Sequence, residues 1–129
     1  MKLFVNKSDS VSVRVYCWEK DGEVEASCLK TDVPQEHIEV VEQVDFTFRK
    51  PSYADSNIII RNSDIKAGGE EMQINVQVFQ EQILRALLID WTIKNEEGNR
   101  VPVNNVSINN LLPSVARAAV AGALEKIKI

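Results

Sequence analysis

Residues 87–103 read LLIDWTIKNEEGNRVPV, and residues 107–113 read SINNLLP. The first stretch begins with the end of an apolar helix and continues as an extended segment that carries Trp91. A charged turn follows, with Gly98 to allow the reversal of the chain. A short return segment then leads to a new helix at Pro113, because proline is tolerated in the first helical turn. These residues therefore predict a connector between two helices and contain no catalytic motif.

The residues before this connector predict a long amphipathic helix over roughly Glu70–Ile89. Apolar residues recur in it at steps of three or four positions, which is the spacing of one helix face. These residues are Met72, Val76, Phe79, Ile83 and Leu87. Glu70 and Glu71 stand at the expected start, where acidic side chains complement the positive end of the helix dipole.

The residues after the connector predict a last helix that is rich in alanine and includes Gly122. Small side chains allow close approach, so we expect this helix to pack against the Glu70–Ile89 helix. The alternative is that its small-residue face binds a partner helix.

The first half of the chain has the alternation of β-strands. Apolar residues occupy every second position over 11–17 and again over 24–28, and Lys20-Asp21-Gly22 lies between the two runs. This pattern predicts a hairpin with a tight turn. One or two further strands are predicted from Ile38 onward, the last of them over Val44–Arg49. Residues 51–61 stay ambiguous, because Pro51 favours a helix start and three consecutive isoleucines favour a strand.

Together these patterns predict a single α+β domain over residues 1–129. Residues 1–50 are expected to be mainly β, as an N-terminal antiparallel hairpin or sheet, and residues 51–129 mainly helical. A chain of 129 residues falls in the usual size range of one domain. No run of apolar residues approaches the length of a membrane span or a signal peptide. We therefore expect an intracellular protein with Cys17 and Cys28 as buried free thiols.

Residues suited to catalysis are scarce. His37 is the single histidine, so a histidine-assisted nucleophile would have to use it, and no Gly-x-Ser-x-Gly motif supports one. A metal site built from several imidazoles is excluded, and no pair of cysteines has ligand spacing. The glycines at 68 and 69 lack the spacing and the lysine of a phosphate-binding loop. The sequence predicts no enzyme, no cofactor and no metal site.

Tyr16 and Trp18 lie on the strand face opposite the alternating valines. Aromatic residues on a sheet can stack on nucleic-acid bases when basic residues surround them. Here Arg14 and Lys20 are outnumbered by acids, and the chain carries a net charge of −4. A second packed layer or a contact with another subunit is therefore favoured over nucleic-acid binding, which survives only as a third alternative.

Two stretches resemble small bacteriophage tail-assembly proteins. Residues 90–113 have the order tryptophan, acid-glycine turn, apolar-proline, asparagine-containing segment and Leu-Pro helix start. Residues 46–55, FTFRKPSYAD, are similar to the entry into the first helix of tail assembly chaperones. The resemblance covers roughly residues 44–127, and residues 1–43 depart from it. It implies that Pro51, Tyr53 and Asp55 shape the first helix. It also implies that the connector between the later helices is shaped by Trp91, Gly98, Pro102 and Pro113.

The resemblance also implies a function. Tail assembly chaperones coat the tape measure protein in the cytoplasm of the bacterial host and are absent from the finished tail. We expect such a protein to self-associate and to hold its client on apolar side chains. The candidate partner-binding residues are Met72, Val76, Phe79, Ile83, Tyr16 and Trp18. The alternative is a structural component of the particle, at baseplate, neck or tail, which the β-rich residues 1–43 favour.

Overall fold

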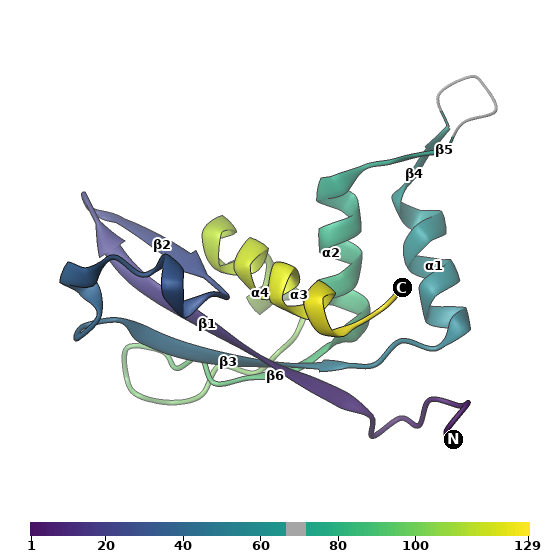
Figure 1. The fold of residues 1–129 in the computed structure, drawn as a ribbon, viewed down its shortest axis with the longest axis horizontal. Coiled ribbons are helices and arrows are strands. Elements are labelled where there is room, and N and C mark those ends of the chain that lie inside the picture. Colours follow the sequence, from purple (N-terminus) through teal and green to yellow (C-terminus); the bar gives the residue numbers. More distant parts are fainter. Residues whose placement is uncertain (67–71) are drawn as a thin grey trace.

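The computed structural model describes the backbone of residues 1–66 and 72–129 and the side chains of residues 1–63 and 75–129. It confirms the α+β class, with an antiparallel sheet followed by helices (Figure 1). The strands are β1 (Ser10–Lys20), β2 (Glu23–Ser27), β3 (Glu42–Arg49), β4 (Asp64–Lys66), β5 (Met72–Ile74) and β6 (Leu88–Trp91). The helices are α1 (Tyr53–Ser63), α2 (Val76–Leu87), α3 (Asn105–Asn109) and α4 (Pro113–Lys126), with short 3-10 turns η1 (Lys30–Asp32) and η2 (Gln35–His37).

Four strands form one sheet in the order β2-β1-β3-β6, and every neighbouring pair is antiparallel. The predicted hairpin is confirmed, with Lys20 paired to Glu23 across a two-residue turn. Asp21 and Gly22 in that turn have φ of 54° and 80°. Two consecutive positive φ angles characterise a type I′ turn, whose twist matches that of the strands it joins. The sequence pattern therefore gave the correct local structure here.

Of residues 51–61, which the sequence left ambiguous, residues 53–61 belong to α1, and Pro51 and Ser52 precede it. Ser52 begins this helix as its cap: its hydroxyl oxygen accepts from the backbone N–H of Asp55 at 3.2 Å. The Asp55 carboxylate in turn accepts from the backbone N–H of Ser52 at 2.9 Å. This reciprocal capping box satisfies two backbone donors that the first helical turn leaves without partners. It outweighs the strand preference of the three isoleucines that follow.

The predicted Glu70–Ile89 helix is wrong at both ends. Residues 72–74 form β5, which pairs with β4 in a separate two-stranded sheet, and Glu70 lies outside the described residues. α2 begins at Val76 because the Asn75 side chain accepts the backbone N–H of Val78 at 3.2 Å. It ends at Leu87, since Leu88 turns to an extended conformation and enters β6. The apolar spacing of three and four identifies the helix but not its limits.

The expected partner of the last helix is also corrected. α4 packs mainly on β1 and β2 and touches α2 less. Gly122 lies so close to the sheet that a Cβ atom there would collide with Cγ1 of Val13 and come within 3.1 Å of Cβ of Cys28. Ser114 Oγ donates to the carbonyl of Val24 at 2.9 Å, and Lys126 Nζ donates to that of Ser12 at 2.5 Å. The small residues therefore serve helix-to-sheet packing.

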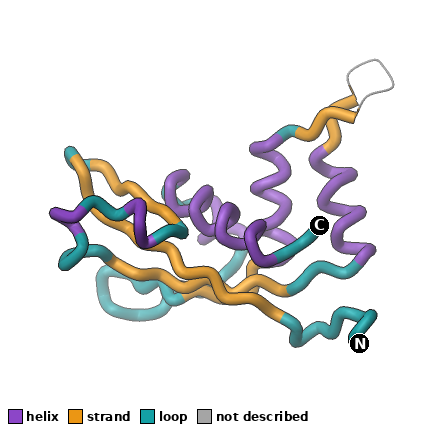
Figure 2. Tube along the Cα trace, in the orientation of Figure 1, coloured by secondary structure: helices purple, strands orange, loops and turns teal. Residues whose placement is uncertain are grey.

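Helices α1, α2 and α4 lie on the same side of the sheet, so the core forms between them and that sheet face (Figure 1). Figure 2 shows the long loop that leaves β6 and returns to α3 at the sheet edge. None of the helices in the described ranges is both long and apolar enough to cross a membrane.

Candidate binding groove

The connector that follows β6 folds back on itself as an irregular hairpin. The backbone N–H of Val101 donates to the carbonyl of Ile93 at 2.9 Å, and Lys94 and Arg100 form an isolated β-bridge. Asn95 organises the tip, because its side-chain oxygen accepts from two backbone N–H groups, each at 3.0 Å. Gly98 has φ of 82°, a left-handed conformation that glycine adopts without steric cost. The loop therefore has a defined shape.

α3 is fixed to the return arm of this hairpin by a second capping box. The Asn104 side chain accepts from the backbone N–H of Ser107 at 2.9 Å, and the Ser107 hydroxyl accepts from that of Asn104 at 3.0 Å. The same hydroxyl donates to the carbonyl of Pro102 at 2.8 Å. These contacts set the start and direction of a helix that has only five residues.

Trp91 lies beneath these segments. Its side chain is 2% exposed and packs edge-on against Phe46, with ring centroids 6.1 Å apart and ring planes at 86°. The indole Nε1 donates to the carbonyl of Val101 at 2.6 Å. One side chain thus joins the core to the return arm of the hairpin.

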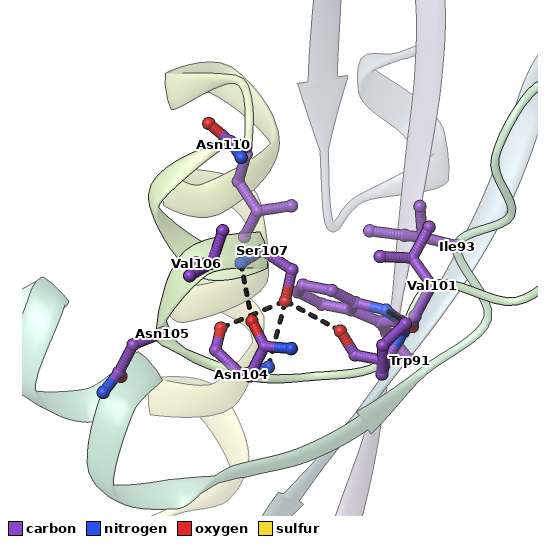
Figure 3. Close-up of a pocket in the computed structure, with 10 residues that line it drawn as sticks. Trp91, Ile93, Val101, Asn104, Asn105, Val106, Ser107 and Asn110 are labelled. Carbon is purple, nitrogen blue, oxygen red and sulfur yellow. Dashed lines mark hydrogen bonds between the residues drawn. The ribbon is translucent and has the colours of Figure 1, made fainter.

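Between the hairpin and α3 lies an open groove of about 740 Å³. Trp91, Ile93 and Val101 lie on one side of it and Ser107 on the other (Figure 3). The remaining lining residues are Pro102, Asn104, Asn105, Val106, Asn110 and Leu111. Val106 is 70% exposed, which is high for a valine in a folded domain. The described lining includes aliphatic, aromatic, amide and hydroxyl groups but no ionisable side chain, so it suits a neutral, largely apolar occupant.

The predicted partner-binding residues of the long helix do not form one surface. Ile83 is fully buried in the core, Phe79 is half-buried against it, and Val76 is 64% exposed. Met72 belongs to β5, and its side chain lies outside the described residues. The apolar residues that were expected to bind a client therefore lie partly on the face of α2 that packs into the core. Among those whose side chains are described, Val76, Phe79 and Ile83 do not line the groove.

Tyr16 and Trp18 are half-buried side chains of β1. Arg14, the basic residue nearest to them on this strand, binds the Asp45 carboxylate through two hydrogen bonds of 2.8 and 3.2 Å. This pair lowers the pKa of Asp45. Trp18 Nε1 is buried and, among the described residues, has no hydrogen-bond partner. Arg14 is therefore already paired within the chain, which removes the main support for a nucleic-acid surface here.

One ion pair links the sheet to the helices. Arg49 of β3 contacts the Asp55 carboxylate at 2.5 and 3.2 Å and donates to the carbonyl of Ala86 in α2 at 2.9 Å. The Arg49 hydrogen bond, supported by those from Ser52, lowers the pKa of Asp55 to about 2. This cluster joins β3, α1 and α2, and it stands outside the lining of the groove.

Residues with metal-binding or nucleophilic chemistry stay apart. Over residues 1–66 and 72–129, no three histidine, cysteine or acidic side chains come together as a possible metal site. Cys17 and Cys28 are free thiols, as expected, but each is half-buried instead of fully buried. Burial, together with the nearby Glu42, raises the pKa of Cys17, which disfavours the reactive thiolate.

The groove is the feature that sequence reasoning missed, although its residues belong to the connector quoted first. The pattern Asn104-x-x-Ser107 is a usable signal, because it predicts a short helix that begins immediately after Pro102 and Val103. Such a helix leaves Val106 in its first turn. The presence of a hollow still depends on how three segments meet in space.

No protein-family model, curated protein or solved structure matches this chain.

Proposed function

We propose that this chain is a non-enzymatic bacteriophage tail assembly chaperone that binds the tape measure protein in the cytoplasm of the bacterial host. The resemblance of residues 44–127 supports the family. The single structural observation that carries a binding role is the apolar groove between the β6–α3 loop and α3. Its volume of about 740 Å³ lies within the usual range of binding pockets, and its described lining has no group that transfers a proton.

The proposed client site is the groove, and not the apolar face of the predicted Glu70–Ile89 helix. An unassembled tape measure protein exposes apolar segments, and a chaperone must cover them without charge selectivity. Val106 and Leu111 from the α3 side, with Ile93 and Val101 from the hairpin, offer such a surface. Because α3 and the hairpin are fixed by hydrogen bonds, the groove exists before the client arrives. A preformed site loses less conformational entropy on binding.

Co-expression with the tape measure protein of the same phage tests this function. The unsubstituted chain is expected to co-purify with the tape measure protein, and Val106→Asp to lower the recovery severalfold. Val40→Asp is the matched control, since Val40 is 71% exposed and does not line the groove. Equal recovery with both variants would remove the groove as the client site. No recovery with any of the three chains would contradict the chaperone function itself.

A structural protein of the particle is the second candidate. It is favoured by the exposed apolar side chains of residues 1–5, which suit a permanent contact between subunits. Mass spectrometry of purified particles separates the two functions. A chaperone is absent from the mature particle, whereas a baseplate, neck or tail component is present in fixed copy number.

A further inference from the structure

Residues 1–5 form an apolar arm outside regular secondary structure, and its apolar side chains are exposed. Met1, Leu3, Phe4 and Val5 are 110%, 78%, 84% and 44% exposed. Elsewhere in the described residues, large exposed apolar side chains are not clustered in this way along the chain. Scattered exposed apolar residues are normal in proteins, but a contiguous set marks an interaction surface.

The base of the arm is held firmly although its apolar side chains are free. Asp9 accepts from the backbone N–H of Asn6 at 2.9 Å and forms an ion pair with Lys2. The backbone N–H of Lys50 donates to the Asp9 carbonyl at 2.8 Å, which ties this turn to the end of β3. The arm therefore has a fixed base, and its Lys2 side chain is already paired with Asp9.

The arm and the groove are complementary in chemistry. The groove lining has no ionisable side chain, and Leu3, Phe4 and Val5 are neutral and apolar. An arm outside regular secondary structure also exposes backbone N–H and C=O groups. The side-chain oxygens of Asn104 and Asn105 already accept from Ser107 and Arg85, but the Asn110 amide in the groove lining can both donate to and accept from such groups. The groove thus fits a short extended apolar segment.

The arm and the groove of one chain lie towards different ends of the molecule. The arm extends beyond the end of β3 at one end of the sheet, whereas the loop after β6 lies towards the other end (Figure 1). We infer that the Met1–Val5 arm of one copy docks in the groove of a second copy. The contact is heterologous, because two different surfaces meet. The inference goes beyond the proposed function, since it concerns the purified chain alone.

The interface is small. Four apolar side chains cover much less than the area of a standard protein interface, so we expect dissociation constants on the order of tens to hundreds of micromolar. The association should be insensitive to salt, because no charged pair crosses the contact. Sedimentation equilibrium over a range of protein concentrations is the appropriate measurement.

Two single variants test the contact from its two sides. Phe4→Ser removes the arm's aromatic residue, and Val106→Asp places a charge in the groove. Each should weaken self-association roughly tenfold or more, because burial of one large apolar side chain changes affinity by at least that factor. Tyr53→Ser and Val40→Asp are the matched controls, since Tyr53 is as exposed as Phe4 (84%) and Val40 (71%) is about as exposed as Val106 (70%). Both controls should associate like the unsubstituted chain.

Mixing the two variants gives the decisive result. The Phe4→Ser chain retains its groove and the Val106→Asp chain retains its arm, so together they can make one intact contact. An equimolar mixture should form 1:1 heterodimers with the affinity of the unsubstituted contact, whereas each variant alone associates roughly tenfold or more weakly. A mixture that stays monomeric overturns the inference. A second measurement compares the NMR signals of groove residues in dilute, monomeric samples of the unsubstituted chain and of Phe4→Ser. A difference between the two would show that the arm occupies the groove of its own chain, which also overturns the inference. Failure of this test leaves the binding of a tape measure protein unaffected.

Discussion

The inner face of α4 and the groove beside α3 are both apolar, but only the first is filled. On α4, Ala119 and Ala123 are fully buried, and Gly122 brings the helix backbone against Val13 of the sheet. In the groove, Trp91 is buried whereas Val106 is 70% exposed. Packing closes the first surface, and a hollow of about 740 Å³ stays open in the second.

The difference arises from what holds each surface in place. α4 contacts the sheet through small side chains, so at Gly122 the helix backbone approaches the strand closely. The walls of the groove are instead held by hydrogen bonds, from Trp91 to the hairpin and from Ser107 to Pro102. Such a frame fixes the positions of the walls without bringing them together. An apolar pattern alone therefore does not tell a core face from a binding face.

Gly122→Val should disrupt the packing of α4 on the sheet and have the largest effect on stability. The new Cβ atom would collide with Cγ1 of the buried Val13 side chain and come within 3.1 Å of Cβ of Cys28, so the strand and the helix would have to move apart. We expect a loss of about 3 kcal/mol in the free energy of unfolding, measured by urea denaturation. Ala121→Val is the control, because Ala121 is exposed on the same helix. A similar loss in both variants would show that helix propensity, and not close packing, dominates.

Trp91→Phe tests the frame of the groove. It removes the hydrogen bond to the Val101 carbonyl and part of a buried ring, for which we expect a loss of about 2 kcal/mol. Faster amide hydrogen exchange at Val101 should accompany it. Trp18→Phe is the contrasting variant, since Trp18 Nε1 is buried without a hydrogen-bond partner among the described residues. Removing that N–H should be close to neutral, and an equal loss in both variants would contradict the role of the Trp91 hydrogen bond.

The pH dependence of the free energy of unfolding should reveal the contribution of the Arg49–Asp55 ion pair, which joins the sheet to the helices. The pKa of Asp55 is lowered to about 2 from an ordinary value of 3.8. Since the folded-state pKa is the lower one, the stabilisation is present above about pH 4 and is lost as the pH falls towards 2. We expect a contribution of roughly 1 to 2 kcal/mol, because both side chains are partly exposed. Denaturation of Asp55→Asn over the same range should show a shallower decline, and an unchanged slope would assign the effect to other carboxylates.

Local signals in the sequence predicted local structure well. Alternation and the Asp21-Gly22 turn were sufficient for the hairpin, and the Pro113 start was sufficient for α4. Residues 51–61 also carry a local signal that favours the helix, because Ser52 and Asp55 have the spacing of a capping box. Contacts between distant segments were not predictable in this way.

The errors concern such distant contacts. Met72 fits the helix spacing but pairs with Lys66 in a second sheet. Leu88 continues the apolar helix pattern but leaves it to pair with Phe48 of β3. The groove depends on β6, the hairpin and α3 meeting in space, so its residues read as a connector in the sequence.

Val106→Asp should have the smallest effect on stability and the clearest effect on binding. Val106 is exposed, so we expect a change within about 0.5 kcal/mol in the free energy of unfolding. Binding of a neutral apolar dye such as Nile red should weaken about tenfold, because a carboxylate must stay hydrated and opposes an apolar occupant. Val40→Asp should change neither quantity. If Val106→Asp instead destabilised the protein as much as Gly122→Val, the groove would be a poorly filled part of the core, and its apolar walls would no longer argue for a partner.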